Sequence, residues 1–159
     1  MKVTDKFVFF FTGKDVFSNF YPVRFTHDGH TFISSEQAVM YRKAKFFGAE
    51  EIAKRILQAK TPERAKELGR SEEIPFEQSA WEQNREAIYE SVLLDKFRTG
   101  SIREQLLRTG QKTLVEASPY DKIWGIKLAI THPDIENPSK WRGQNLLGKV
   151  LERVREQLR

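Results

Sequence analysis

The segment SSEQAVMYRKAKFFG, residues 34–48, places a carboxylate and an ammonium on one face of an expected helix. At 100° per residue, Glu36, Val39, Met40, Lys43 and Phe47 fall on a common stripe. Glu36 and Lys43 are two turns apart, about 10 Å along that face, so both charged ends can reach a ligand between them. A partly buried carboxylate can act as a general acid or base, and a partly buried lysine can act as a nucleophile.

The same stripe has a structural interpretation, which the residues leave open. Ser34 and Gln37 fit a capping box with Ser34 as N-cap, and Glu36 in the first turn suits the positive end of the helix. Lys43 can extend its ammonium to water past an apolar stem. The opposite side of the helix holds Ala38, Arg42 and Lys45.

Three further segments place polar or aromatic side chains beside turns or helix starts. FSNFYP holds Asn19, SPYDKIWG holds Asp121 and Trp124, and WRGQNLLG holds Gly143 and Asn145 just before an apolar helix. A helix N-terminus at the last segment would offer N–H groups to an anion. The structural alternatives are an Asx turn at the first segment and capped helix starts at the other two.

The elements expected around these segments form an α+β fold dominated by helices, with a small antiparallel β-sheet near the N-terminus. FVFFF is typical of a buried strand, VRFTHDGHTFI is typical of a hairpin with Asp28-Gly29 in its turn, and KTLVEA is compatible with a strand. In the structural alternative for SPYDKIWG, Ser118 would be the helix cap. Helices are expected over about 35–47, 49–59, 62–69, 78–98, 102–110 and 143–158. No repeat or linker interrupts the chain, so residues 1–159 are expected to form a single domain.

The composition narrows the class of protein. With 159 residues, 39% hydrophobic and 31% charged, the chain is long enough to bury one globular core. It has no cysteine, which excludes disulfides and thiol nucleophiles and fits a cytoplasmic location. No apolar run approaches the ~20 residues of a membrane span, and the N-terminal residues do not resemble a signal peptide. The three histidines lack metal-binding spacing, so neither a metal nor a cofactor is expected.

Positive charge gathers at the C-terminal end of the chain. The net charge is +5, and residues 140–159 hold six Lys or Arg against two Glu. A basic end of this kind favours phosphates or nucleic acid. The alternative interpretation is a solvated helix face that binds nothing, and the sequence leaves both open.

Taken in order, these segments resemble the NADAR family, also called YbiA-like. The resemblance covers residues 7–158 and rests on FSNFYP, DGHTFISSEQAVMYRKAKFFG, AKELGR, a Trp followed four residues later by Arg, KF, EASPYDKIWGI and WRGQNLLG. Its most specific parts are SSEQ with Lys43 seven residues after Glu36, and EASPYDKIWG followed by WRGQNLLG. The family implies a compact, mainly helical fold and the hydrolysis of N-glycosidic bonds in nucleotide-like substrates.

The resemblance implies two substrate groups, phosphoribosylamino-pyrimidine intermediates of riboflavin synthesis and ADP-ribose attached to guanine bases. The better-known riboflavin-type members have a WGDGG-like stretch where this chain has WGIKL, which favours the ADP-ribose branch. The family often has Gly after WGI, so Lys127 is expected to bring a long cation to a pocket edge. The expected partner is a nucleotide-like small molecule or ADP-ribosylated nucleic acid, with no membrane and no indicated oligomeric state.

The family's pocket motifs also assign residues. The matching positions are Glu36, Lys43, Asp121, Trp124, Asn145, Asn19, Arg70 and Trp81. We expect Glu36 to transfer the proton that the leaving base needs. Asp121 is expected to hold the ribose hydroxyls or to stabilise the charge that develops at C1.

The remaining positions are expected to bind substrate. Trp124, with Trp81 as a second candidate, would stack on the base. Asn145 and the backbone N–H groups near Gly143 would hold a phosphate, and Arg70 would help them. None of these assignments follows from spacing alone, because Trp124, Gly143 and Asn145 also fit the capped helix starts of the structural interpretation.

Lys43 has two alternative roles. As a neutral amine it would attack the imine carbon of a ring-opened glycosylamine and form a Schiff base, which water later releases. As a fixed cation it would pair with Glu36 or with a phosphate. Two rival functions also stay open: a module that binds ADP-ribose without cleaving it, and a basic domain that binds unmodified nucleic acid with strong salt dependence.

Overall fold

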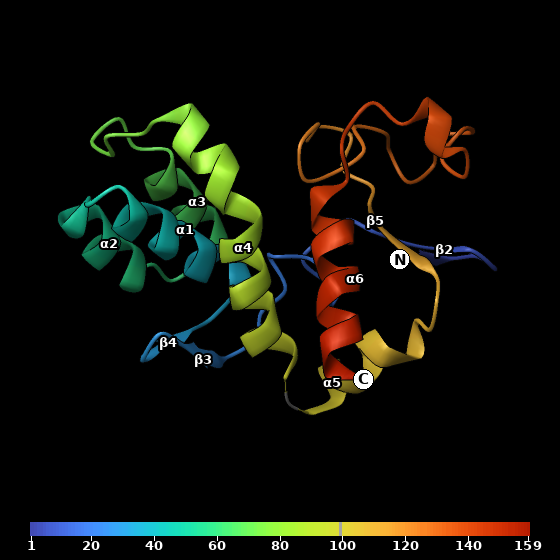
Figure 1. Ribbon diagram of the computed structural model, residues 1–159, viewed down its shortest axis with the longest axis horizontal. Helices are drawn as coiled ribbons and strands as arrows, with labels where there is room; N and C mark the ends of the chain where they lie inside the picture. Colours follow the sequence, from blue (N-terminus) through green and yellow to red (C-terminus); the bar gives the residue numbers. More distant parts are fainter. Residues whose placement is uncertain (99) are drawn as a thin grey trace. The chain divides into compact units, whose positions relative to one another are not determined.

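The computed structural model describes residues 1–98 and 100–159 (Figure 1). In chain order the elements are β1 (Lys2–Val3), β2 (Phe7–Phe10), β3 (Phe25–His27), β4 (His30–Phe32), α1 (Ser35–Phe46), α2 (Glu50–Leu57), α3 (Pro62–Gly69), α4 (Gln78–Phe97), α5 (Gly100–Arg108), β5 (Thr113–Glu116), the 3₁₀ helix η1 (Pro138–Lys140) and α6 (Leu146–Leu158). This order confirms the α+β class dominated by helices. The chain forms two compact units, one of Asn19–Lys96 and one of Met1–Ser18 with Phe97–Arg159. That both belong to one domain stays a prediction.

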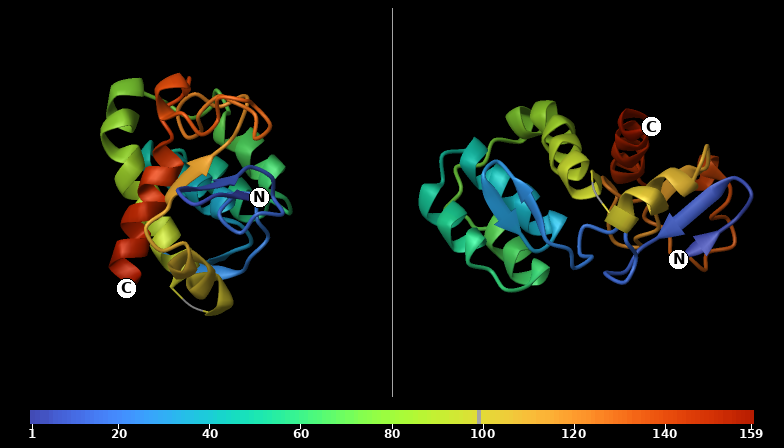
Figure 2. Two further views of the ribbon diagram at one scale, coloured as in Figure 1. Left: turned by 90° about the vertical axis from the view of Figure 1, so that its right-hand side faces the viewer. Right: turned by 90° about the horizontal axis from the view of Figure 1, so that it is seen from below.

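The hairpin of the Asn19–Lys96 unit forms where the sequence places it. Asp28 and Gly29 have φ angles of 50° and 76°, the positive values that a two-residue hairpin turn requires. Phe32 is buried, and the centre of its ring lies 5.6 Å from the ring centre of Tyr41 in α1. Figure 2 shows the β3–β4 hairpin beside this helix. His27 Nδ1 lies 2.7 Å from the carboxylate of Asp95, which ties the hairpin to α4.

The start of α1 is held by side chains that bond backbone groups. Ser34 Oγ accepts from the N–H of Gln37 at 3.1 Å, which confirms Ser34 as the N-cap. The Gln37 side chain accepts from the N–H of Ile33 and donates to the carbonyl of Ile56, so one amide fixes both the entry to α1 and the end of α2. The expected division of α1 into two sides is wrong at Ala38, which is fully buried because this helix packs against α2 and α3.

The helix α3 begins and ends as predicted. Thr61 Oγ1 accepts from the N–H of Arg64, and Pro62 occupies the first turn. At the other end, a Cβ on Gly69 would lie 2.1 Å from the sulfur of Met40. Glycine therefore lets the end of α3 approach α1 closely, at the level of Met40.

The second unit contains a three-stranded sheet in the order β1-β2-β5. β1 and β2 are antiparallel, as β3 and β4 are, which confirms antiparallel pairing near the N-terminus. β5 pairs with β2 in parallel, and the sequence did not predict this pairing. One face of the sheet is covered by the chain that follows β5, in a core of Phe7, Phe9, Val115, Ala117, Ile126, Leu128 and Ile135.

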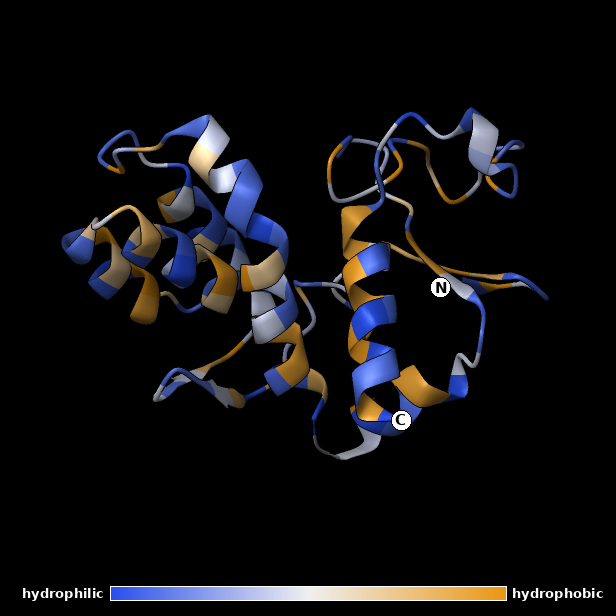
Figure 3. Ribbon diagram, viewed as in Figure 1, coloured by the Kyte–Doolittle hydropathy of each residue, from blue (hydrophilic) through white to orange (hydrophobic). Residues whose placement is uncertain are grey.

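Helix α6 packs on β5 and completes its outer edge. A Cβ on Gly148 would lie 1.9 Å from the carbonyl oxygen of Leu114, so only glycine permits this approach. Glu152 accepts from the N–H of Leu114 at 2.9 Å, which supplies a partner that a strand would otherwise provide. The apolar edge of α6 is visible in Figure 3. The helix begins at residue 146, three residues later than predicted, because Asn145 has the left-handed φ of 53°.

Part of the basic C-terminal end is structural. The guanidinium of Arg155 is buried and donates to Thr109 Oγ1 at 2.9 Å and to the carbonyl of Lys112 at 2.8 Å. The neighbouring cations Lys149, Arg153 and Arg159 are exposed. None of the helices in the described part of the chain is long and apolar enough to cross a bilayer. The cytoplasmic location stays a prediction.

Candidate active site

The predicted site residues fall into two groups. Asn19, Glu36, Lys43, Arg70 and Trp81 belong to the Asn19–Lys96 unit. The other unit contains Asp121, Trp124, Gly143 and Asn145. Each group is described within its own unit.

Asn19 and Glu36 meet at the N-terminus of α1. The Glu36 N–H donates to the carbonyl of Asn19 at 2.9 Å, and Ser35 Oγ donates to Asn19 Oδ1 at 2.8 Å. The alternative of an Asx turn is therefore not found, since the Asn19 side chain holds α1 and not its own loop. Glu36 is buried, with 8% of its surface exposed. A carboxylate at this place lies at the positive end of the helix.

Lys43 is half-buried and lies against the end of α3. Its Nζ donates to the carbonyl of Gly69 at 2.9 Å and lies 4.9 Å from the ring centre of Phe76. Burial lowers the pKa of Lys43 below its usual value, and the charge of Arg70 lowers it further. The carboxylate of Glu36 opposes both effects. The structure thus couples Glu36, Lys43 and Arg70 electrostatically, although their positions in the sequence are far apart.

An aromatic cluster surrounds the Lys43 ammonium. Trp81 is buried, its ring centre 5.8 Å from Lys43 Nζ, and it packs against Phe46 and Phe47 with ring centres 6.1 Å apart. Phe46 and Phe76 are 41% and 44% exposed. The open aromatic surface here belongs to these two phenylalanines, and sequence reasoning singled out neither of them. Phe46 lies in the SSEQAVMYRKAKFFG segment, and Phe76 lies outside every quoted motif.

Sequence reasoning also missed Lys96, which lies in α4 and is 1% exposed. Its Nζ donates to Ser35 Oγ at 3.4 Å, one residue from Glu36. It lies 5.9 Å from the ring centre of Tyr21. Burial lowers the pKa of Lys96 to about 7. The dipeptide KF marked this position as part of the family pattern, but nothing in the sequence indicated its burial.

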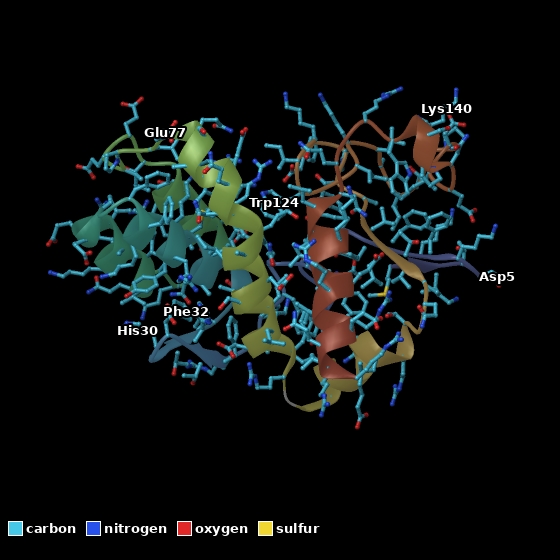
Figure 4. All side chains as sticks on the ribbon, viewed as in Figure 1. Asp5, His30, Phe32, Glu77, Trp124 and Lys140 are labelled. Carbon is cyan, nitrogen blue, oxygen red and sulfur yellow. The ribbon has the colours of Figure 1, made fainter. Side chains whose placement is uncertain are left out.

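Asp121 and Trp124 lie in a turn, and the alternative of a helix start capped by Ser118 is not found. Ser118 Oγ accepts from the N–H groups of Tyr120 and Asp121, both at 3.2 Å. Asp121 Oδ1 accepts from the N–H groups of Ile123 and Trp124, at 2.8 and 2.9 Å. Within the described residues, Asp121 Oδ2 accepts no hydrogen bond. Trp124 is half-buried and lies beside the N-terminal end of α6 (Figure 4), where its carbonyl accepts from the N–H of Leu147.

The residues before α6 are bonded to this same turn. The N–H groups of Gln144, Asn145 and Leu146 donate to the carbonyls of residues 122, 125 and 123, and a Cβ on Gly143 would lie 2.3 Å from the oxygen of Gly125. The Asn145 amide accepts from the N–H of Glu116 at 3.0 Å and donates to the carbonyl of Leu114 at 2.9 Å. These groups hold the turn and β5 in the structure described here.

Lys127 is exposed and has the left-handed φ of 54°. Glycine adopts this conformation without steric cost, which gives a backbone reason for glycine after WGI in the family. The glycine that the family often has after WGI is thus explained by backbone conformation, without a role at a pocket edge. The Lys127 ammonium has no hydrogen bond or ion pair within the described part of the chain.

The comparisons agree with this fold. The NADAR domain profile matches residues 9–159, and the chain belongs to this family. Protein irg-1 of Caenorhabditis elegans is 40% identical over 98% of this chain and 81% of that protein. N-glycosidase R617 of Acanthamoeba polyphaga mimivirus is 37% identical over 97% of both chains. The NMR structure of the E. coli protein YbiA matches with a TM-score of 0.79 at 28% identity, over 99% of this chain and 87% of that one.

A plant relative points to one metabolic branch of the family. Riboflavin biosynthesis protein PYRR of Zea mays is 29% identical over 89% of this chain. The matched region makes up 23% of that longer protein. Several other relatives are named N-glycosidases. The protein is thus a hydrolase of the class that acts on N-glycosyl bonds.

The buried Lys96 makes stability depend on pH in a defined window. The unfolded chain keeps the ordinary lysine pKa of 10.5, whereas the folded chain releases the proton at about 7. The unfolded state therefore binds more protons between these values, and stability should rise as pH increases across that window. We expect one lysine ¹³Cε resonance to titrate near pH 7 and to be lost in Lys96→Met. Lys54, which is exposed, serves as the internal control. If no lysine resonance titrated near pH 7, the lowered pKa assigned to Lys96 would be contradicted.

Replacing Lys127 by glycine should stabilise the protein. A left-handed conformation costs a residue with a side chain about 1 kcal/mol, so we expect Lys127→Gly to raise the free energy of unfolding by up to about that amount. Urea denaturation measures it. Lys149→Gly, an exposed position inside α6, should have the opposite sign because glycine weakens a helix interior. Destabilisation by both variants would refute the backbone explanation.

Proposed function

We propose that the protein removes ADP-ribose from guanine bases of nucleic acid by hydrolysing the N-glycosidic bond. The observation that carries the proposal is the pair Glu36 and Lys43 on α1, a buried carboxylate and a half-buried amine. Burial lowers the pKa of Lys43, Arg70 lowers it further, and Glu36 raises it. An acid and an amine placed along one helix face can act on the two sides of a C1–N bond. The WGIKL stretch supports the ADP-ribose branch, because riboflavin-type members carry a WGDGG-like sequence there.

In this proposal Glu36 donates a proton to the leaving base. The C1–N bond breaks, its electron pair goes to the base nitrogen, and the proton from Glu36 neutralises it. Water then adds to C1 and returns a proton to the Glu36 carboxylate, so the enzyme is regenerated. Glu36 is buried at the start of α1, which supports a role toward a bound substrate.

Lys43 acts in one of two ways. If the glycosylamine opens to an imine, the neutral Lys43 amine adds to C1. The two protons of that amine pass to the base nitrogen, the bond from C1 to the base breaks, and the base leaves as a neutral amine. The lysine imine that remains is hydrolysed by water. Otherwise Lys43 stays a cation and stabilises negative charge in the site. Its lowered pKa supports the first role, and its bond to the Gly69 carbonyl is compatible with both.

Asp121 and Asn145 divide the supporting work. Asp121 Oδ2 is the oxygen left to hold ribose hydroxyls, since Oδ1 fixes the turn that carries Trp124. We assign Asn145 and Gly143 a positioning role. Both polar atoms of the Asn145 amide hold β5, and the missing side chain of Gly143 lets the chain approach the carbonyl of Gly125. The half-buried Trp124 is proposed to stack on the base.

A second candidate is hydrolysis of phosphoribosylamino-pyrimidines of riboflavin synthesis. The specific observation in its favour is the similarity to the maize protein PYRR, which is named for riboflavin biosynthesis. The same Glu36 and Lys43 chemistry would act on that substrate, so only the substrate distinguishes the two candidates.

The first test compares both substrates. Purified protein is incubated with a guanine-ADP-ribosylated oligonucleotide or with the phosphoribosylamino-pyrimidine, and mass spectrometry follows the released sugar. We expect release of ADP-ribose from the oligonucleotide, and Glu36→Gln should slow it by about 10²- to 10⁴-fold because it removes the transferable proton.

The control is Glu72→Gln, an exposed carboxylate of the same unit, which should leave the rate unchanged. Release from the pyrimidine alone would replace the first candidate with the second. Tight ADP-ribose binding without any turnover would identify a binding module and reject both.

Borohydride reduction tests the role of Lys43. If the imine forms, reduction during turnover traps a secondary amine on Lys43, which peptide mass spectrometry locates. Lys43→Arg keeps the positive charge but cannot form the imine, so it should lose the adduct and most of the activity. An adduct on Lys96, the other amine with a lowered pKa, would transfer the role to that residue. Full activity without an adduct would leave Lys43 as a fixed cation.

A further inference from the structure

A hollow of about 360 Å³ lies on the surface of the Asn19–Lys96 unit, beside α3. It is lined by Phe20, Glu63, Lys66, Glu67 and Arg70. Glu63, Lys66 and Glu67 of α3 and its C-cap residue Arg70 follow the helical spacing that puts them on one face. A volume of this size lies within the range of small-molecule sites. Phe20 comes from the FSNFYP segment, so the hollow joins two of the motifs that the sequence singled out.

The cations of this hollow have no anionic partner. Among the described residues, neither Lys66 nor Arg70 has a side-chain hydrogen bond or ion pair, and Lys66 Nζ lies 5.7 Å over the ring of Phe20. The carboxylate of Glu67 is bonded to Arg64 at 2.6 Å, which offsets its charge. Two cations one helical turn apart, both available, can bind the oxygens of a phosphate or diphosphate.

The other two groups match the rest of a nucleotide. The half-buried ring of Phe20 can stack on a base, and every base has a face for such a contact. The carboxylate of Glu63, which has no partner within the described residues, can accept hydrogen bonds from ribose hydroxyls. An aromatic ring, a carboxylate and two cations thus lie in one hollow, as recognition of a nucleoside diphosphate requires.

The hollow adjoins the proposed catalytic amine. Lys43 Nζ donates to the carbonyl of Gly69, and the next residue, Arg70, lines the hollow. A diphosphate held by Arg70 would therefore lie one residue along the chain from the carbonyl that binds Lys43. In ADP-ribose the diphosphate separates the reacting ribose from a second ribose and an adenine.

We propose that the hollow binds the nucleoside diphosphate part of the substrate, with Lys66 and Arg70 on the phosphates, Glu63 on the ribose and Phe20 on the base. The inference rests on the proposed removal of ADP-ribose, since it names the site for the half of that substrate remote from the reacting bond. A phosphoribosylamino-pyrimidine has one phosphate and no second base, and would leave the ring of Phe20 unused.

The test is ADP binding to the full chain, measured by calorimetry without any turnover. We expect ADP to bind, Lys66→Gln and Arg70→Gln each to weaken it about tenfold, and the double variant to weaken it about a hundredfold. Lys60→Gln removes an exposed cation just before α3 and should change nothing. NMR shifts of the Phe20 ring and of α3 amides on addition of ADP should locate the ligand.

Inorganic pyrophosphate separates nucleotide recognition from binding of any anion. We expect it to bind more weakly than ADP, and Phe20→Leu to weaken ADP about tenfold while leaving pyrophosphate unchanged. Equal binding of the two ligands, unaffected by Phe20→Leu, would overturn the nucleotide assignment. No ADP binding, or equal loss in Lys60→Gln and Lys66→Gln, would overturn the site. Because the assay needs no catalysis, ADP binding without any N-glycosidase activity would retain this site while rejecting the proposed function.

Discussion

Buried backbone groups at the ends of short elements need hydrogen-bond partners, and in both units single side chains supply them. Gln37 accepts from the N–H of Ile33 and donates to the carbonyl at the end of α2. Asn145 and Glu152 complete the outer edge of β5, which has a strand on one side only. Loss of one such amide leaves two buried backbone groups unpaired at once, at a cost of about 1 to 3 kcal/mol each. The positions of α1, of the turn with Asp121 and of α6 all depend on these contacts.

The same constraint separates motif residues that maintain the fold from those left for chemistry. Both polar atoms of the Asn145 amide are used, so its place in the family motif is explained without a ligand. Asp121 can serve both tasks, because one carboxylate oxygen fixes the turn and the other, which we propose holds ribose hydroxyls, accepts nothing in the described residues. Lys43 also combines them, since its donation to Gly69 holds the end of α3 while its amine stays beside Phe76.

Local signals made much of the fold predictable. Ser34 and Thr61 cap helices, and Asp28-Gly29 forms the hairpin turn, because short-range sterics and hydrogen bonds decide these features. The parallel pairing of β5 with β2 was not predictable, because strands separated by about a hundred residues pair through tertiary contacts that no local pattern encodes. For the site, the face shared by Glu36 and Lys43 followed from helical periodicity. The burial of Lys96 did not, since a lysine near a helix C-terminus is ordinarily solvated.

Helix α3 connects the proposed amine to the proposed nucleotide site through eight residues. Its last carbonyl accepts from Lys43, and its exposed face carries Lys66 and Arg70. The charge of Arg70 lowers the pKa of Lys43 by repulsion. A diphosphate bound by Arg70 would cancel part of this repulsion, and that change alone would raise the pKa of Lys43. Burial is the larger of the two lowering causes in the free protein, so it continues to oppose charging of Lys43 when a diphosphate offsets Arg70.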